Sequence, residues 1–387
     1  MRVIINRGDA MKVTVLQENL ARGLGTVSKA VSPRSTLPVL ANVLIASDEG
    51  RLRLSATNLE MGITCWIPAR IEEEGSTTVP ARTFNDLVST LPSDQVMLKL
   101  DVSTQTLNVR GGTSTNDIKC IDAQEFPPLP VPDLDGAMQI NAGDFREMIH
   151  QVAFAASSDE ARPVLMGVLV QVDKDKLTMA AADGFRLSVR KAILSAPVPA
   201  PVSAIIPAQA LKELARVAND GEEPIYMVLP KGRGQVIFRV KDVEVVSQLI
   251  DGTFPDFNQI IPRSYKSRTL VSTASLLKAC KQAEIFAREG SNVARFNIKS
   301  AQGEMQPSEV EITATSEETG KNETIVEATV DGSGVLIAFN VKFLREALEV
   351  IRTPNVALET SAANAPGVVR PVGEDDFLHV IMPMHLG

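Results

Sequence analysis

The sequence has 387 residues, of which 44% are hydrophobic and 22% are charged, and its formal net charge is −8. This length is too great for one hydrophobic core and fits about two to four domains of ordinary size. No apolar run approaches the roughly 18 residues that a membrane-spanning helix needs, and residues 1–10 lack the apolar centre of a signal peptide. We therefore expect a cytoplasmic protein without a membrane partner, and the acidic charge alone argues weakly against nucleic acid.

One segment of the sequence appears three times, at a spacing of roughly 125–130 residues. The copies lie at residues 79–88, 206–214 and 339–348. Repeats of this length are whole domains and not the short units of a solenoid. The expected organisation is an N-terminal extension followed by three tandem copies of one domain. Their boundaries are predicted as 1–10, 11–135, 136–266 and 267–387.

The first copy gives the predicted order of elements. An apolar stripe with helical spacing runs through Leu16, Leu20, Leu24, Val27 and Val31. Alternating strand-like residues follow at 51–57, and a second helix is predicted from Ala81 to Leu91, where Pro92 stops it. Further strands are expected at 96–100 and 107–110. Each copy is thus predicted to contain strands, a helix, strands, a helix and strands, so the fold class is α+β with two helices packed on antiparallel sheets in each domain.

The three cysteines stand apart from one another in the sequence. Cys65, Cys120 and Cys280 have no metal-ligand spacing, and their number is odd. Reduced, buried thiols in a cytosolic protein are the expected state.

Positive charge is concentrated on the six expected helices. On provisional boundaries they hold twelve basic and nine acidic residues, a surplus of three. The basic residues are Arg22, Lys29, Arg82, Arg146, Lys212, Arg216, Lys278, Lys281, Arg288, Lys342, Arg345 and Arg352. If the helices share one surface, that surface is basic and suits a phosphate backbone. The alternative is that these are ordinary solvated helix faces.

Six segments, in order along the chain, carry a family resemblance. They are 33–40 (PRSTLPVL), 57–61 (TNLEM), 79–82 (VPAR), 182–187 (ADGFRL), 251–256 (DGTFPD) and 380–384 (VIMPM). The ordered set resembles the bacterial β sliding clamps, the β subunit of DNA polymerase III. The resemblance implies a head-to-tail homodimer that forms a closed ring, with helices lining a hole around duplex DNA. It also implies a processivity factor that tethers the polymerase without sequence specificity.

The resemblance places three arginines near DNA, namely Arg34, Arg82 and Arg162. The basic helix residues Arg22, Lys29, Arg146, Lys212, Arg216, Lys278 and Lys281 are further candidates for contact with the phosphates. An arginine can equally pair with a nearby carboxylate, so a structural role stays open for each. Pro163 and Val164 stand where some relatives carry aromatic residues that touch DNA.

A peptide-binding cleft is implied in the same way. Relatives use it to bind short linear motifs of the polymerase III catalytic subunit, the clamp loader, other polymerases and repair proteins. The matching positions are Leu165, Gly184, Phe185, Arg186, Leu187, Pro255, Ile260, Val380, Ile381, Met382, Pro383 and Met384. The sequence departs from relatives at Phe185, where some have histidine, and at His385, where arginine is common. Ordinary core or strand positions are the alternative for this set.

The resemblance also implies a subunit interface. Ile285 and Phe286 match apolar residues by which the third domain meets the first domain of the partner, and Ile118 matches the opposing side. Asn116 replaces an apolar residue that is common there. The alternative is that Ile285 and Phe286 form an internal core pair.

The sequence contains no signature of catalysis. It has no phosphate-binding glycine loop, and His150, His379 and His385 have no metal spacing and no nucleophile partner. We therefore expect no cofactor, no metal and no intrinsic activity, so that a nucleotidyltransferase label would belong to the polymerase holoenzyme. Two rival hypotheses remain: a nuclease with a carboxylate–metal site, for example at Asp375 and Asp376, and a scaffold that binds only proteins.

Overall fold

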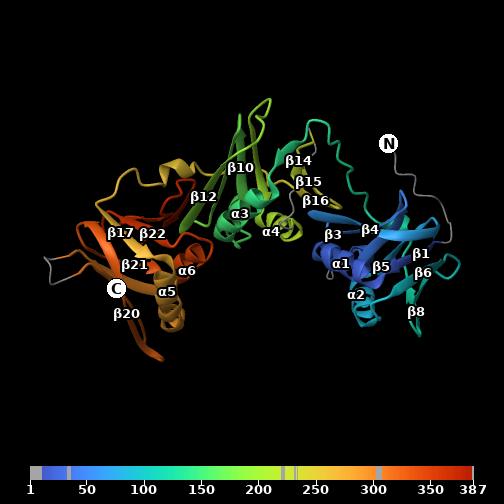
Figure 1. Cartoon of the computed structure of the whole chain (residues 1–387), viewed down its shortest axis with the longest axis horizontal. Helices are drawn as coiled ribbons and strands as arrows, with labels where there is room; N and C mark the ends of the chain where they lie inside the picture. The colour runs from blue at the N-terminus through green and yellow to red at the C-terminus, as the bar shows by residue number, and fades with distance from the viewer. Residues whose placement is uncertain are drawn as a thin grey trace. The chain divides into compact units, whose positions relative to one another are not determined.

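The computed structural model describes residues 11–32, 36–218, 223–230, 232, 234–301 and 307–385. These residues form 24 β-strands and six α-helices, joined in places by short 3-10 turns (Figure 1). One pattern occurs three times: a strand, a helix, four strands, a second helix and three more strands. The predicted order of elements and the six principal helices are confirmed. The predicted N-terminal extension, residues 1–10, lies outside the described residues.

The three copies contain equivalent elements. The first comprises β1 (Lys12–Leu16), α1 (Gln17–Val27), β2 (Asn42–Asp48), β3 (Arg51–Thr57), β4 (Met61–Glu73), β5 (Ser76–Pro80), α2 (Ala81–Thr90), β6 (Gln95–Asp101), β7 (Thr106–Gly111) and β8 (Ser114–Lys119). The second comprises β9 (Met138–Ile140), α3 (Ala142–Val152), β10 (Gly167–Asp173), β11 (Lys176–Ala182), β12 (Arg186–Ile193), β13 (Val202–Pro207), α4 (Ala208–Val217), β14 (Ile225–Val228), β15 (Gln235–Val240) and β16 (Val243–Gln248). The third comprises β17 (Ser267–Ser272), α5 (Thr273–Ala287), β18 (Val293–Lys299), β19 (Glu309–Ser316), β20 (Gly320–Gly332), β21 (Val335–Asn340), α6 (Val341–Glu349), β22 (Asn355–Thr360), β23 (Gly367–Pro371) and β24 (Phe377–Ile381).

The strands form two 12-stranded sheets, and each sheet lies within one of two compact units of the chain. The first unit comprises Met1–Gly143 and Glu213–Leu249, and its sheet joins β1–β8 to β9 and β14–β16. The second unit comprises Asp144–Lys212 and Ile250–Gly387, and its sheet joins β10–β13 to β17–β24. The middle copy therefore contributes strands to both sheets.

Equivalent strands join the copies in both units. In the first unit β16 runs antiparallel to β4, with Val243 opposite Cys65. In the second unit β24 runs antiparallel to β12 in the same way, with Phe377 opposite Arg190. The last strand of one copy thus pairs with the fourth strand of the copy before it, and the backbone hydrogen bonds of the sheet continue across each junction.

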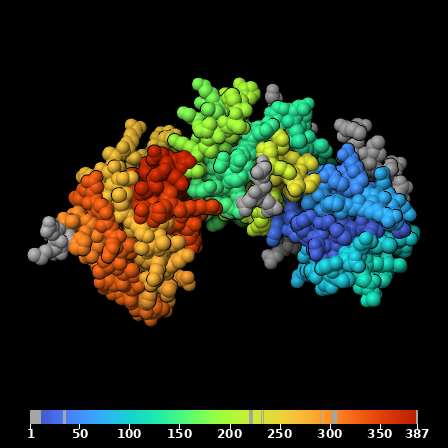
Figure 2. Space-filling model, viewed as in Figure 1, coloured from blue at the N-terminus to red at the C-terminus, as the bar shows by residue number. Residues whose placement is uncertain are grey.

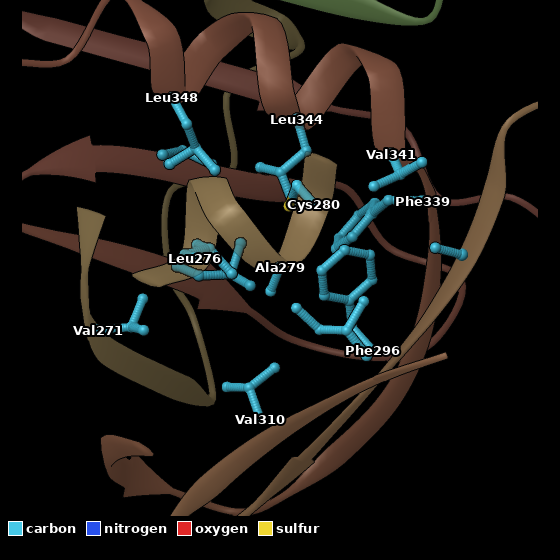
Figure 3. Close-up of a cluster of buried hydrophobic side chains, with 14 of the residues drawn as sticks. Val271, Leu276, Ala279, Cys280, Phe296, Val310, Phe339, Val341, Leu344 and Leu348 are labelled. Atoms are coloured by element: carbon cyan, nitrogen blue, oxygen red, sulfur yellow. The ribbon is translucent and has the colours of Figure 1, made fainter. Parts of the chain in front are cut away.

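The core of the third copy illustrates how each domain is held together. Leu344 and Leu348 of α6 point towards Leu276 and Cys280 of α5 (Figure 3). These residues belong to one buried cluster that continues onto the strands. Burying each such large apolar side chain contributes about 1.5–3 kcal/mol, so the helices are fixed mainly by packing against the sheet.

The first helix differs from its predicted apolar stripe at both ends, because α1 ends at Val27 and Val31 lies beyond it. Leu20, Leu24 and Val27 are fully buried in α1, but Leu16 is 53% exposed. Leu16 is the last residue of β1 and precedes the helix, so it does not share the helical face. The second helix ends at Thr90, as the following Pro92 predicted.

The cysteines are free thiols, as expected, although only Cys65 and Cys280 are buried and Cys120 is half-buried. Burial raises the pKa of the Cys65 thiol to about 11, with a smaller contribution in the same direction from Asp242. Among the helices in the described part of the chain, none has the length and apolar character needed to cross a membrane.

Candidate functional sites

The predicted DNA-contacting residues lie on or beside the helices. Arg22, Lys29, Arg82, Lys212, Arg216, Lys278 and Lys281 are exposed, and Arg146 is half-buried. Arg34 lies outside the described residues. The side chain of Arg82 is 96% exposed and lies 3.8 Å from the Asp86 carboxylate, a distance that allows it to turn towards another anion.

The helix bounds change the expected charge balance. Helices α1–α6 contain nine basic and eight acidic residues, a surplus of one and not of three. The larger surplus was wrong because Lys29, Arg288 and Arg352 lie just beyond helix ends. Two of the acidic residues, Glu213 and Glu284, are only 3% and 8% exposed, so they contribute little to the charge of the surface.

Arg162 is held by the protein itself. Its Nε lies 2.9 Å from Asp159 Oδ2, and its Nη1 donates to the backbone carbonyl of Asp183 at 3.0 Å. A Cβ atom on Gly184 would lie 3.0 Å from the same Nη1, and the φ of Gly184 is +94°. Arg162 therefore supports the turn that carries Gly184, where only glycine fits without strain.

The residues predicted for the peptide cleft meet where β12 pairs with β24. Leu187 lies opposite Val380, and both belong to a buried cluster against which Leu165 packs. The backbone N–H of Met382 donates to the carbonyl of Phe185 at 2.9 Å. This pairing brings the Gly184–Phe185 turn and the C-terminal segment together.

The exposed part of this region is apolar. Phe185 is 55% exposed, Ile260 38% and Met382 37%. Pro255 and Ile260 belong to the segment that follows β16, next to the buried Phe254 and Phe257. Flexible methionine and a close backbone turn suit a surface that accepts varied apolar ligands.

Three predicted cleft positions have other surroundings. Ile381 is fully buried in the core of the third copy, because neighbouring side chains of a strand point to opposite faces. The backbone N–H of Met384 donates to the carbonyl of Ala338 at 2.8 Å and so fixes the segment that contains Pro383. Arg186 is only 9% exposed and lies between the second and third copies.

The guanidinium of Arg186 is fully engaged. Nε donates to Asp183 Oδ2 at 3.0 Å, Nη1 to Glu346 Oε2 at 2.5 Å, and Nη2 to the carbonyl of Phe154 at 2.9 Å. It also lies over the ring of Phe343, 4.2 Å from the centroid. Sequence reasoning missed these partners, because nothing in the local pattern relates Glu346 to a residue 160 positions earlier.

Next to Arg186 is the buried His379, for which the sequence showed no obvious nucleophile partner, although a serine contacts it in the structure. His379 shares a hydrogen bond of 2.7 Å between its Nδ1 and Ser188 Oγ, and its ring stacks on Phe154 with centroids 5.5 Å apart. Burial, and secondarily the charge of Arg186, lower the pKa of His379 to about 3. The imidazole is therefore neutral at ordinary pH and acts as part of the core.

The residues predicted for the subunit interface lie near two strand edges. Within the described residues β8, which carries Ile118, pairs only with β7. In β20, the part from Gly320 to Glu327 pairs with β19 on one side and leaves its other side open. Ile285 is 59% exposed on α5, and Ile325 of β20 is 57% exposed.

The other interface residues are more enclosed. Ile118 is 7% exposed, and Phe286 is half-buried against the core of the third copy. Asn116, on the β8 edge, donates from Nδ2 to Ser114 Oγ at 2.9 Å. The exposed apolar candidate is therefore Ile285.

No candidate metal centre emerges from the described part of the chain. Among these residues, no group of three or more His, Cys, Asp and Glu side chains is placed to hold an ion. The arrangement consists of exposed cations on helices, an apolar surface beside a glycine turn, and the strand edges of β8 and β20 that are open within the described residues.

Comparison with known proteins identifies the family. Three family models match in chain order: the N-terminal domain of the DNA polymerase III beta subunit over residues 11–130, its central domain over 139–256 and its C-terminal domain over 258–385. The chain is 33% identical to a beta sliding clamp of Synechococcus elongatus, over 97% of this chain and all of that protein, and 32% identical to one of Bacillus subtilis, over 97% of this chain and 99% of that protein.

A solved structure agrees with these matches. The crystal structure of the DNA polymerase sliding clamp from Bacillus subtilis is similar with a TM-score of 0.90 and 30% identity, covering 97% of this chain and all of that one. Both sequence and fold match along the whole length. The chain belongs to the family of bacterial β sliding clamps, the β subunits of DNA polymerase III.

Proposed function

We propose that this protein is a DNA sliding clamp, a non-catalytic processivity factor that encircles duplex DNA as a head-to-tail homodimer and tethers the replicative polymerase. The observation that carries the proposal is the junction between copies, which occurs twice within the chain. Among the described residues, β8 and β20 are the complementary strands of a third such junction, and the side of each that it would use is open.

The two internal junctions share an equivalent backbone hydrogen bond in addition to their strand pairing. Where β16 meets β4, Trp66 N–H donates to the Asp242 carbonyl at 2.9 Å. Where β24 meets β12, Lys191 N–H donates to the Asp376 carbonyl at 2.8 Å. Trp66 and Lys191 occupy equivalent positions in the fourth strands of their copies, so one geometry serves both junctions.

At both internal junctions the last strand of one copy pairs with the fourth strand of another, and the same rule predicts how two chains meet. The last strand of the first copy is β8, and the fourth strand of the third copy is β20. Both are open on the side that the rule requires. The two internal junctions pair β16 with β4 and β24 with β12, so neither of them uses the open side of β8 or of β20. A second chain supplies both partners, and a head-to-tail contact that closes covers β8 and β20 in both chains.

The register of this pairing follows from the internal junctions. Gly62 lies opposite Val246 in the first unit. The strand registers make Lys321 equivalent to Gly62, and Asp117 equivalent to Val246. Asp117 of one chain is thus expected directly opposite Lys321 of the other, which favours association because their charges are opposite.

Two chains would supply twelve helices to the inner surface of the ring. At about 10 Å each, side by side, they give a circumference of roughly 120 Å and a clear hole of about 28 Å. A duplex with grooves of about 8 Å depth, roughly 20 Å across, fits with room for water. Cations that reach only phosphates bind without sequence preference, which sliding requires.

Tethering then follows from effective concentration. A ring that stays on the DNA keeps a bound polymerase near the primer end, which can raise apparent affinity ~10²–10⁴-fold without new base contacts. We propose that the catalytic subunit, the clamp loader and repair proteins bind through short peptides at the apolar surface of Phe185, Ile260 and Met382. We also propose cytoplasmic localisation, and domain boundaries at 11–135, 136–266 and 267–387.

Retention on DNA tests the clamp. Protein loaded onto nicked circular duplex is expected to stay through gel filtration and to be lost when the circle is cut once. If cutting the circle made no difference to retention, topological linkage would be refuted. Magnesium-dependent cleavage of the DNA would favour the nuclease hypothesis, and failure to be retained on any circle with a loader present would favour a scaffold that binds only proteins.

Peptide binding is tested at Phe185. Phe185→Ala removes an exposed aromatic side chain and is expected to weaken binding of a polymerase-derived peptide about tenfold or more, since aromatic anchors dominate such contacts. Ile193→Ala is the matched control, because Ile193 is 66% exposed at the far end of β12. Equal affinity of the two variants for the peptide would rule out the assignment.

A further inference from the structure

Helices α3 and α6 of the second unit end beside one another. Gln151, near the end of α3, donates from Nε2 to the carbonyl of Val350, just beyond α6, at 3.4 Å. Gln151 is only 2% exposed, whereas His150 and Arg352 are exposed. This hydrogen bond brings the ends of α3 and α6 together, so the imidazole of His150 and the guanidinium of Arg352 lie beside one seam between the second and third copies, which we call the α3–α6 seam.

The α3–α6 seam is positively charged. Partial burial lowers the pKa of His150, and Arg146 and Arg352 lower it further, against an opposing effect of Glu147. Helix C-termini carry partial negative charge and would favour a protonated imidazole. The lowered pKa means that burial and the two guanidinium groups outweigh that effect.

The nearby acidic group is already engaged. Glu147 Oε1 accepts a hydrogen bond from Gln151 Nε2 at 3.3 Å, and Arg190 of β12 interacts with the same carboxylate electrostatically. Within the described residues, Arg352 forms no ion pair. Among the described residues, the Arg352 guanidinium therefore presents a positive charge at the seam that no carboxylate pairs with.

We propose that the α3–α6 seam binds a phosphodiester of the DNA backbone between protonated His150 and Arg352, with Arg146 adding positive charge behind them. This inference rests on the proposed function, which brings the helices to DNA. A phosphate supplies the negative charge that the seam lacks, so it stabilises the imidazolium, and DNA binding takes up a proton at His150. Duplex affinity therefore increases as the pH falls.

Only the middle copy has a histidine at this helix position, so the pH dependence of duplex affinity is expected from that copy alone. The helix starts align His150 with Gly25 in α1 and with Lys281 in α5. Gly25 has no side chain to titrate, and Lys281 is paired with Glu349 at 3.0 Å. Of the three equivalent positions, only His150 has an imidazole, which can take up a proton when a phosphate binds beside it.

Histidine NMR of the full-length protein tests the proposal. The sequence has three histidines, so with imidazole ¹³Cε1 labelling the His150→Gln variant identifies the His150 signal. A short duplex is expected to raise the apparent pKa of His150 from its value in free protein. Between pH 8 and pH 6, the slope of log affinity against log salt should steepen by up to about 0.9, as for one added phosphate contact.

Variants and a small anion separate the outcomes. His150→Gln should remove the pH dependence of duplex affinity, Arg352→Gln should reduce the salt slope at both pH values, and His385→Gln should do neither. An unchanged or lowered His150 pKa on duplex addition would overturn the proposal. The proposal would also be overturned if inorganic phosphate, at matched ionic strength, raised the pKa of His150 and the duplex did not. Retention on circular DNA does not depend on these results, so the clamp function is tested separately.

Discussion

Arg186 joins the second and third copies through hydrogen bonds from all three nitrogens of its guanidinium group. Its acceptors are Asp183, the Phe154 carbonyl and Glu346, and the aromatic ring of Phe343 covers one face. A buried ion pair of this kind adds little net stability relative to an apolar pair, but removing one partner leaves the other charge uncompensated.

Substitution of Arg186 is therefore expected to be costly. Arg186→Met keeps apolar contact with Phe343 and should lower the free energy of unfolding by about 3 kcal/mol, since Glu346 loses its partner. Urea unfolding measures the loss, with Arg82→Met as the control because the side chain of Arg82 is 96% exposed. Adding Glu346→Gln should recover part of the loss. Equal stability of Arg186→Met and Arg82→Met would contradict the structural role.

His379 predicts a pH dependence of stability. Its pKa of about 3 in the folded protein lies below the ordinary value of 6.5, so the unfolded chain binds more protons between these limits. The contribution of His379 to the free energy of unfolding is fully present above pH 6.5, the ordinary pKa. It falls as the pH decreases below that value, by at most about 1.4 kcal/mol per pH unit. The difference in urea midpoint between pH 7 and pH 5 should be smaller in His379→Asn. If the variant kept the full wild-type difference, other groups would be responsible.

At the scale of elements, local patterns predicted which segments are helices and strands, because apolar spacing of about 3.6 or 2 depends only on neighbouring residues. The end of α2 before Pro92 and the start of α6 after Asn340 follow local rules of this kind. The Asn340 side chain accepts hydrogen bonds from the backbone N–H groups of Lys342 and Phe343.

The choice of strand partners could not be predicted in this way. Nothing local relates β16 to β4, whose paired residues are well over a hundred positions apart. For the same reason the resemblance, which placed Arg186 and Ile381 in a peptide cleft, could not show that Arg186 bonds two copies together or that Ile381 is buried in the core of the third copy. The exposure of Phe185 and Met382 also depends on which strands pair in the sheet. The resemblance could therefore name these residues but not the residues around them.

The edges β8 and β20 carry the element-scale prediction. Asp117→Lys and Lys321→Asp each place like charges opposite one another. Each should weaken both contacts of the dimer by about 1 kcal/mol, or the dimer as a whole roughly 30-fold. The double variant restores opposite charges and should return the dimer dissociation constant towards that of the wild type. Sedimentation measures the constant. If the double variant were as weak as the sum of the single variants, Asp117 and Lys321 would not face each other.

At the scale of the whole molecule, a closed ring makes two properties independent of each other. One is how strongly the protein contacts DNA, and the other is how long it stays on a circular duplex. A closed ring leaves a circular duplex only by opening a subunit interface, so its lifetime there depends on the dimer contact. Exposed cations such as Arg82 and Lys278 instead govern the salt-dependent attraction to phosphates.

This separation can be measured with two sets of variants. Ile285→Asp buries an unpaired charge at the proposed interface and should shorten the lifetime on circular DNA at least tenfold, while the monomer stays folded because Ile285 is exposed. Arg82→Ala with Lys278→Ala should leave that lifetime nearly unchanged, yet lower the salt slope of binding to linear duplex by roughly 2. The reverse result, with the cation variants released from circles and Ile285→Asp retained, would mean that ionic contact and not ring closure holds this protein on DNA.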